Sequence, residues 1–245
     1  MTKQNSNKRS GESGNVLFLI LIAVALFAAL SYAVTQSTRT GGGSTENETN
    51  ALSSASIAQY PATLRTSVVR MILNGVGVDQ LEFNPPSNFF GFGNQTALDT
   101  AGPESLVFHP SGGGGVYQTA TDVSPSDGNW YFNADFEIPL IGIDGAGGND
   151  LIAFLPGISS ALCTRINEEV GLDPSTESSA GSGIPTFATT LAAIRDNAIT
   201  GNLVDAGADG TDMTNATTDF NGQPTGCFQE TGSNEFVFYS VLLER

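Results

Sequence analysis

One feature constrains this 245-residue chain more than any other: nineteen uncharged, almost wholly apolar residues follow one another over 16–34. An α-helix rises about 1.5 Å per residue, so this run is long enough to cross the roughly 30 Å hydrocarbon core of a bilayer. Lys3, Lys8 and Arg9 precede the run, whereas only Arg39 lies soon after it. Because basic flanks stay in the cytoplasm, we expect one membrane helix with the remaining residues exported.

Three interpretations of this N-terminus stay open. The run is an uncleaved signal anchor, or it is an ordinary signal peptide cut after Ala33, because Ser31-Tyr32-Ala33 is an acceptable small-x-small site. A secretory signal core has only about 7–15 apolar residues, so the run is long for that role. In the third interpretation, a prepilin-type signal, the cut falls before the apolar run, which survives as the start of a long helix.

The segment KRSGESG, followed directly by NVLFLILIAVALFAAL, resembles the N-terminus of type IV pilin-like proteins and pseudopilins. The resemblance covers about residues 8–36. It implies cleavage between Gly14 and Asn15 by a prepilin peptidase, with methylation of the new amine of Asn15. It also implies contact with inner membrane lipid and with other pilin-like subunits.

The chain departs from this family at the fifth mature position, where members typically carry Glu and this chain has Leu19. In the family, that carboxylate lies in the apolar filament core and pairs with a neighbour's N-terminal amine. A buried charge without a partner is costly, so the pair specifies the assembly register. Minor pseudopilins at a filament tip show the same departure. Leu19 therefore indicates either a tip-like minor subunit or a protein that never polymerises.

The apolar run, the glycines and the later patterns divide the chain into four parts. Gly41 to Gly43 should break the membrane helix and act as a flexible joint. Apolar residues at helical spacing predict a second, amphipathic helix that ends near Leu73, before Asn74-Gly75, and that Pro61 kinks or divides. The parts are a basic leader (1–14), a transmembrane helix (15–36), a glycine joint with the amphipathic helix (37–74) and an extracytoplasmic domain (75–245).

After residue 75 the pattern changes to short strands with long loops. Residues 130–137 alternate between apolar and polar side chains, which predicts a strand with one buried face. Further strands are predicted at 105–108, 116–118 and 150–155, the last ended by Pro156-Gly157, and a helix at 186–199. A helix from Ser159 or Ser160 to Val170 should be capped by Gly171, and a hairpin should place 236–243 at the centre of the sheet.

The predicted fold class is therefore α+β. It comprises an N-terminal transmembrane helix and a second amphipathic helix packed on a mainly antiparallel sheet domain with long loops and one disulfide. The disulfide is expected because Cys163 and Cys227 are the only cysteines and both are exported.

Charge limits the partners of the exported part. Beyond residue 35 the chain has six Arg, no Lys and 24 acidic residues. Such an acidic balance argues against binding of nucleic acid or anionic lipid headgroups, and it favours solubility, cations or basic partners.

Catalytic and cofactor motifs are weak. His109 is the only histidine, and the chain has neither G-x-S-x-G nor H-E-x-x-H, so we do not expect an enzyme. Gly112 to Gly115 lack the Lys-Ser/Thr ending of a phosphate loop and predict a flexible loop. Some pseudopilins hold calcium in an acidic loop, which makes Asp205, Asp209 and Asp212 weak calcium candidates; their spacing does not match an EF-hand. No other cofactor is expected.

Two functions from different classes fit these observations. The first is a pilin-like structural subunit, minor or tip-like, in a bacterial filament or secretion pseudopilus. It would be a single-pass inner membrane protein whose C-terminal domain lies in the periplasm or at the cell surface. The alternative is a non-polymerising, membrane-tethered extracytoplasmic binding module that uses the glycine joint as its tether.

Overall fold

The computed structural model describes residues 13–83, 102–142, 149–172, 184–196, 211–213 and 220–245. By its internal contacts the chain divides into two compact units, Met1–Thr49 and Asn50–Arg245. The second, which we call the folded unit, contains all the strands.

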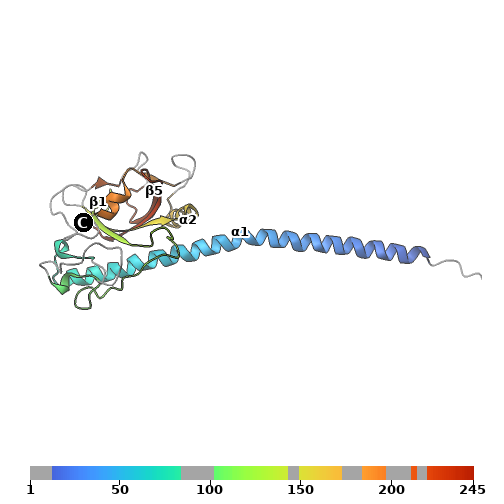
Figure 1. Cartoon of the computed structure of the whole chain (residues 1–245), viewed down its shortest axis with the longest axis horizontal. Helices are drawn as coiled ribbons and strands as arrows, with labels where there is room; N and C mark the ends of the chain where they lie inside the picture. Colours follow the sequence, from blue (N-terminus) through green and yellow to red (C-terminus); the bar gives the residue numbers. More distant parts are fainter. Residues whose placement is uncertain (1–12, 84–101, 143–148, 173–183, 197–210, 214–219) are drawn as a thin grey trace, which may run out of the picture. The chain divides into compact units, whose positions relative to one another are not determined.

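The N-terminal part of the chain forms one helix, α1 (Ser13–Leu73; Figure 1). The predicted break at Gly41 to Gly43 is wrong, because the backbone is helical through all three glycines. A glycine in a helix costs only about 1 kcal/mol relative to alanine, and extending an existing helix is much easier than nucleating a new one. Pro61 also lies inside α1 without ending it, and its ring is buried.

The predicted end of this helix is confirmed. α1 stops at Leu73, and Gly75 follows in the left-handed conformation with φ +94°. The N–H of Val76 donates to the Met71 carbonyl oxygen at 3.1 Å, and that of Gly75 donates to the Ile72 carbonyl oxygen at 2.9 Å. These bonds satisfy the last carbonyls of the helix, as expected for a glycine stop.

The folded unit contains a six-stranded mixed sheet in the order β3-β5-β6-β2-β1-β4. The long pairings β1–β2, β2–β6 and β5–β6 are antiparallel, and the short edge strands β3 and β4 pair in parallel. The predicted hairpin and the central position of the last strand are confirmed. The strands are β1 (Tyr131–Glu137), β2 (Asp150–Ile158), β3 (Thr186–Phe187), β4 (Thr211–Asp212), β5 (Thr225–Glu230) and β6 (Phe236–Leu243).

Two further helices and two 3-10 turns complete the described elements. The predicted helix α2 (Ser160–Val170) is confirmed, including its cap at Gly171. The predicted helix at 186–199 is wrong at its start, because Thr186 and Phe187 form β3; α3 is described over Leu191–Asp196, and 197–199 lie outside the described residues. The turns are η1 (Val78–Gln80) and η2 (Pro103–Ser105).

Apolar side chains from both faces of the sheet enter separate cores. Leu151, Ala153 and Leu155 of β2 belong to one core, and the intervening Ile152 and Phe154 belong to the other. The first core also contains buried residues of α1 and α2; those of α1 are Ile57, Tyr60, Leu64, Val68 and Met71. The amphipathic part of α1 therefore packs on the sheet as predicted, and the two-sided burial explains why β2 and β6 are apolar at almost every position.

β1 is confirmed as a strand, but the prediction of one buried face is wrong. Phe132 packs in the core next to α1, whereas Phe136 packs in the opposite core, although the two residues have the same parity. The register against β2 shifts between Asn133 and Phe136. Side chains alternate strictly between the two faces of a regular strand. Because of this irregularity, the side chains at the end of β1 lie on the opposite face of the sheet from the one that alternation predicts.

Three other predicted strand boundaries are wrong. β2 does not end at Pro156 but continues to Ile158, with Gly157 at φ +82° and a register shift that keeps the chain paired with β6. Residues 105–108 form only one isolated bridge, between Glu82 and Leu106, and 116–118 are not a strand. Val107, Phe108 and Tyr117 of these stretches are buried in the core that contains α1, whereas Val116 is 67% exposed, so core packing rather than sheet pairing explains the buried apolar residues.

Candidate functional site: the apolar segment of α1 and the disulfide-closed sheet edge

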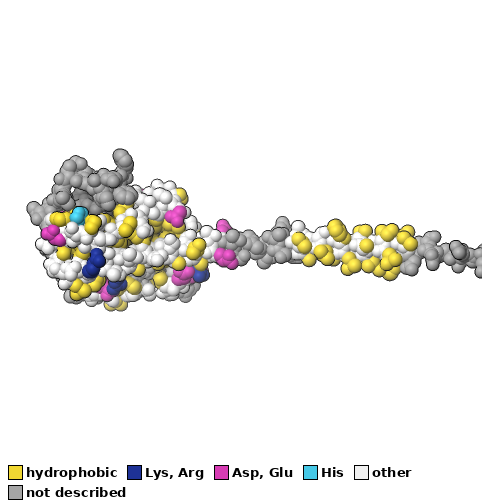
Figure 2. All heavy atoms as spheres, turned by 90° about the horizontal axis from the view of Figure 1, so that it is seen from below, with side chains coloured by type: hydrophobic (Ala, Val, Ile, Leu, Met, Phe, Trp, Pro, Cys, Tyr) yellow, Lys and Arg dark blue, Asp and Glu magenta, His cyan; other side chains and the backbone are white. Residues whose placement is uncertain are grey.

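The first candidate is the apolar segment of α1, which we define as Val16–Thr35. It is the one helical stretch in the described residues that is long and apolar enough to cross a membrane. Its large side chains are exposed, and Leu19 is 60% exposed. Figure 2 shows apolar side chains along this segment on the face in view. An exposed apolar surface of this extent calls for lipid or a protein partner.

The predicted processing residues Gly14 and Asn15 lie in the first turn of α1, directly before this segment. Their backbone is already helical. The predicted cleavage point therefore lies at the second helical residue, where a cut would leave the rest of α1 as the new N-terminus.

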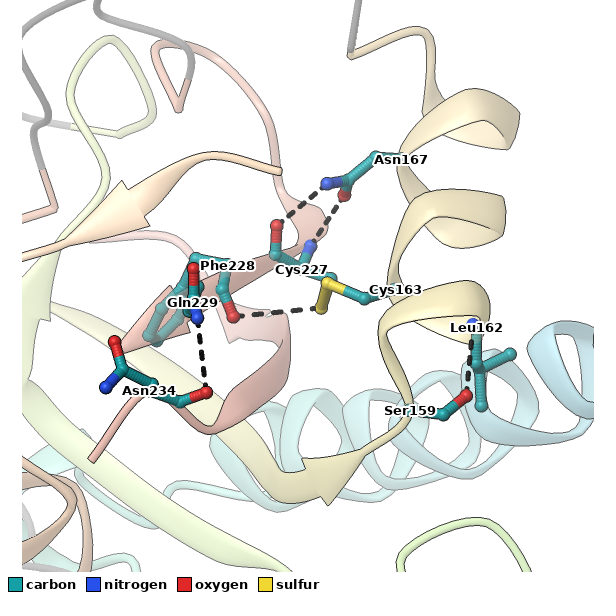
Figure 3. The surroundings of a disulfide bond; sticks show 8 residues. All are labelled: Ser159, Leu162, Cys163, Asn167, Cys227, Phe228, Gln229 and Asn234. Carbon is teal, nitrogen blue, oxygen red and sulfur yellow. Dashed lines mark hydrogen bonds between the residues drawn. A yellow bond between two sulfur atoms is a disulfide. The ribbon is translucent and has the colours of Figure 1, made fainter. Parts of the chain in front are cut away.

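The second candidate is the place where α2 meets β5. Cys163 of α2 and Cys227 of β5 form the predicted disulfide, with their Cα atoms 5.4 Å apart. Both cysteines are fully buried within the core that contains α1. The bond closes a loop with a sequence separation of 64 residues (Figure 3).

Asn167 was not predicted as a structural residue, yet it forms the main polar contact at this place. Its Nδ2 donates to the Cys227 carbonyl oxygen at 2.9 Å, and the Cys227 N–H donates to its Oδ1 at 2.8 Å (Figure 3). The side chain is 1% exposed. One signal in the sequence could have revealed it: Asn167 stands four residues after Cys163, on the face of α2 that carries Leu162 and Ile166.

This contact covers an open edge of the sheet. β3 pairs with β5 only at Gln229 and Glu230, so Cys227 lies beyond the end of that pairing. Unpaired backbone groups on a sheet edge invite pairing with another chain. The amide of Asn167 occupies the donor and acceptor of Cys227 in the way that a neighbouring strand would.

Both ends of α2 are also fixed. The Leu162 N–H donates to Ser159 Oγ at 3.2 Å, a regular N-terminal cap, and Gly171 adopts the left-handed conformation at the other end. Ser54 Oγ of α1 donates to Glu169 Oε2 at 2.6 Å. α2 therefore contacts both α1 and β5, and its fixed ends position Cys163 for the disulfide to Cys227 of β5.

A charged cluster attaches α3 to the start of β1. Arg195 Nη2 lies 2.6 Å from Asp127 Oδ2, and the guanidinium carbon lies 5.6 Å from the centre of the Tyr131 ring. The Tyr131 hydroxyl donates to the same carboxylate at 3.1 Å. Burial, followed by the negative charge of Asp127, raises the pKa of Tyr131 above its ordinary value. This arrangement joins two segments and holds no nucleophile activated by a base.

The glycines at 112–115 are not the flexible loop that we predicted. A side chain at Gly112 or Gly113 would collide with the carbonyl oxygens of Leu106 and Val107, so the chain passes too close for any other residue. Arg70 of α1 donates to the Gly113 carbonyl oxygen. His109 lies in the preceding turn, where its Nδ1 accepts a hydrogen bond from the Ser111 N–H at 3.1 Å. Residues 109–115 therefore form a tightly packed turn that passes close to the backbone of Leu106 and Val107.

The predicted calcium candidates are not brought together in the described structure. Asp212 lies in β4, exposed, and pairs in register with Glu137 of β1. Asp205 and Asp209 lie outside the described residues. Within the described ranges no group of three or more His, Cys, Asp or Glu side chains could hold a metal ion.

Two surface hollows lie beside α1, of about 350 and 320 Å³. Amide, hydroxyl and backbone groups line them, with Glu104 as the only charged side chain in the first and none in the second. A catalytic site needs a nucleophile or general base held against a reacting group. The lining of these two hollows provides no such pair.

Comparison with protein-family models, with curated proteins and with solved structures gives no match. The function is therefore argued from the apolar segment of α1, its leader, and the folded unit behind it.

Proposed function

We propose that this chain is a membrane-anchored pilin-like structural subunit, minor or tip-like, of a bacterial filament or secretion pseudopilus. The observation that carries the proposal is the composition of α1. α1 carries an exposed apolar segment near its start and a buried amphipathic stretch at its end, and a basic leader ending in Gly14 comes just before the apolar segment.

The continuity of α1 supports a structural role. The resemblance to pilin-like proteins implies a long N-terminal helix whose second half packs on the sheet. α1 runs without a break from Ser13 to Leu73, and Leu64 and Val68 are fully buried against sheet residues. The apolar half would hold the subunit in the inner membrane before assembly and would contact other subunits afterwards.

Leu19 supports the narrower assignment to a minor or tip-like position. It is an exposed leucine in the apolar segment, where family members carry a carboxylate. Without that carboxylate the subunit cannot neutralise the N-terminal amine of a subunit ahead of it. A position with no subunit ahead makes no such demand, which is the situation at a filament tip.

The outward side of α1 in the folded unit supports contact with neighbours. Between Glu48 and Asp79 the chain has no acidic residue, although the rest of the folded unit is rich in them. We call this exposed side the acid-free face. It consists of Leu52, Ala55, Ser56, Ala58, Gln59, Ala62, Thr63, Arg65, Thr66, Val69, Arg70 and Leu73. The carboxylate of Glu244, which borders this face, is paired with Arg65 at 2.8 Å, so a neighbouring acidic subunit could approach the face with little charge repulsion.

N-terminal sequencing of the mature protein tests the proposal. A start at Asn15 is the expected result, and an intact Met1 or a start at Val34 would overturn it. Gly14→Val should block processing and leave the leader attached. Gly11→Val, which makes the same change three residues earlier, is the matched control and should be processed normally.

The alternative is a non-polymerising, membrane-tethered extracytoplasmic binding module, and Leu19 is the observation that favours it. Sheared surface fractions separate the two functions: a pilin-like subunit is found there, whereas a tethered module stays with the membrane. Ala62→Glu on the acid-free face should lower the amount in the sheared fraction, and Ala62→Gln, of similar size without the charge, should not. If neither the wild type nor Ala62→Gln is ever sheared off, the tethered module is the better assignment.

A further inference from the structure

The folded unit carries a large uncompensated negative charge. Asn50–Arg245 contains 22 Asp and Glu, five Arg and no Lys, which gives a net charge of −17 with histidine neutral. Because charged residues make up only 14% of the whole chain, this imbalance does not arise from a generally charged surface. It arises because basic residues are nearly absent.

The few arginines neutralise only a small share of the acids. Ion pairs join Arg65 to Glu244, Arg195 to Asp127, and Arg165 to Glu168 and Glu169. Arg70 donates instead to a backbone carbonyl oxygen. Exposed carboxylates without a basic partner remain on three separate segments, at Glu104, Asp122 and Asp212.

Folding also brings some carboxylates into the interior. Glu137 is 3% exposed and Asp150 is fully buried on the neighbouring strand β2. Backbone N–H groups of Ile138 and Arg245 donate to the Asp150 carboxylate, and no ion pair to a basic side chain is found for it among the described residues. The folded state thus concentrates negative charge that the unfolded chain would spread over a much larger volume.

The size of the folded unit, compared with the Debye length, shows that dissolved ions can screen the repulsion between its carboxylates. A compact unit of this length has a radius of gyration of about 16 Å. The Debye length is about 10 Å at 0.1 M salt and about 3 Å at 1 M. At the lower concentration neighbouring carboxylates on one surface still repel one another, and at the higher concentration this repulsion is largely screened.

From this charge balance we infer that the folded unit depends on dissolved cations for stability, through diffuse screening of its carboxylates rather than through one binding site. Its stability rises with ionic strength, and monovalent cations suffice. The inference does not rest on the proposed function, since it holds for a filament subunit and for a tethered module alike.

Thermal unfolding of the full-length protein in a nonionic detergent tests the inference, with the fluorescence of the buried Trp130 as the signal. We expect the midpoint to rise by at least about 8 °C between 0.05 and 1 M NaCl, since one kcal/mol corresponds to about 2–4 °C for a domain of this size. KCl should give the same curve. Sucrose of equal osmolality should give a clearly smaller rise, because it is excluded from the surface but does not screen charge.

Two variants with the same three altered positions separate charge from every other effect. Glu104→Gln, Asp122→Asn and Asp212→Asn together remove three exposed charges, so they should raise the midpoint at low salt and reduce its dependence on NaCl. Glu104→Asp, Asp122→Glu and Asp212→Glu keep the charges and should behave like the wild type. A midpoint independent of NaCl, or identical salt curves for both variants, would overturn the inference. So would full stabilisation by micromolar CaCl2 at low ionic strength, which would indicate one specific site.

Discussion

Asn167 and Cys227 are joined through a side-chain amide that takes both backbone hydrogen-bonding groups of the cysteine, at 2.9 and 2.8 Å. Cys163, one helical turn before Asn167, forms the disulfide with the same residue. Three bonds thus connect one turn of α2 to one residue of β5. Because β3 does not reach this part of β5, α2 takes the place of an edge strand here.

Replacing Asn167 with leucine should destabilise the folded unit by roughly 2–4 kcal/mol. The substitution conserves size but leaves the buried N–H and C=O of Cys227 without partners, and each unsatisfied group costs about 1–3 kcal/mol. Urea unfolding measures the change. Glu168→Gln, at the next and exposed position, should cost less than about 0.5 kcal/mol. A loss below about 1 kcal/mol for Asn167→Leu would contradict the edge-covering role.

Removing the disulfide should cost about 4 kcal/mol. The sequence separation of 64 residues sets this value in the chain-entropy model. Cys163→Ala with Cys227→Ala avoids free thiols, and the wild type with and without reductant gives an independent comparison. Because the amide contact and the disulfide hold the same turn of α2, their losses should not be additive. Strict additivity in the triple variant would mean that the two contacts act independently.

The sequence predicts the elements whose signals are local and misses those set by distant contacts. The cap at Ser159 and the stop at Gly171 are local, so α2 is predicted to within a residue. Both faces of β1 are buried because cores lie on both sides of the sheet, and Phe132 and Phe136 enter opposite cores because of an irregularity between Asn133 and Phe136 that period-two alternation does not reveal. The glycines of 112–115 looked like a flexible loop because only the packed structure shows the carbonyl oxygens that they pass.

The same distinction applies to the candidate site. Two cysteines in one chain predict their own pairing, and the length of the apolar run predicts a helix able to cross a membrane. Asn167 is a single polar residue on an apolar face, and its role depends on the absence of a strand beside Cys227. The predicted break at Gly41 to Gly43 is wrong because the free-energy cost of glycine in a helix is small, and extending an existing helix is much easier than starting a new one.

Leu140→Gly should stabilise the folded unit by up to about 1 kcal/mol. Leu140 occupies the third position of the turn from Ile138 to Ile141, where the Ile141 N–H donates to the Ile138 carbonyl oxygen at 3.1 Å. Its φ is +66° and its side chain is 70% exposed. This left-handed conformation costs a non-glycine residue about 1–2 kcal/mol, part of which the greater freedom of unfolded glycine offsets. Leu140→Ala keeps the strained backbone and is the matched control for loss of the side chain. Equal stability of the two variants would rule out relief of strain.

Asp150 should make the folded unit less stable as the pH rises from about 4 to about 7. Burial raises the pKa of this carboxyl from 3.8 to about 6, against the opposing effect of the Ile138 and Arg245 N–H groups, and the charges of Glu137 and Glu244 raise it further. Between these two values the folded state binds a proton that the unfolded chain has lost. The contribution of Asp150 is therefore fully present below about pH 4 and is lost as the pH rises through about 6.

Asp150→Asn tests this dependence, because asparagine stays neutral at every pH. The variant gives up one backbone acceptor, so its stability at pH 4.5 should be slightly below that of the wild type. The difference should shrink or reverse by pH 7, where only the wild type buries a charge. Asp122→Asn removes the same charge from an exposed position and is the matched control. Free energies of unfolding from urea titrations at both pH values give the comparison, at constant ionic strength so that screening does not vary. If the difference between wild type and Asp150→Asn is the same at both pH values, Asp150 does not change its protonation state in this range.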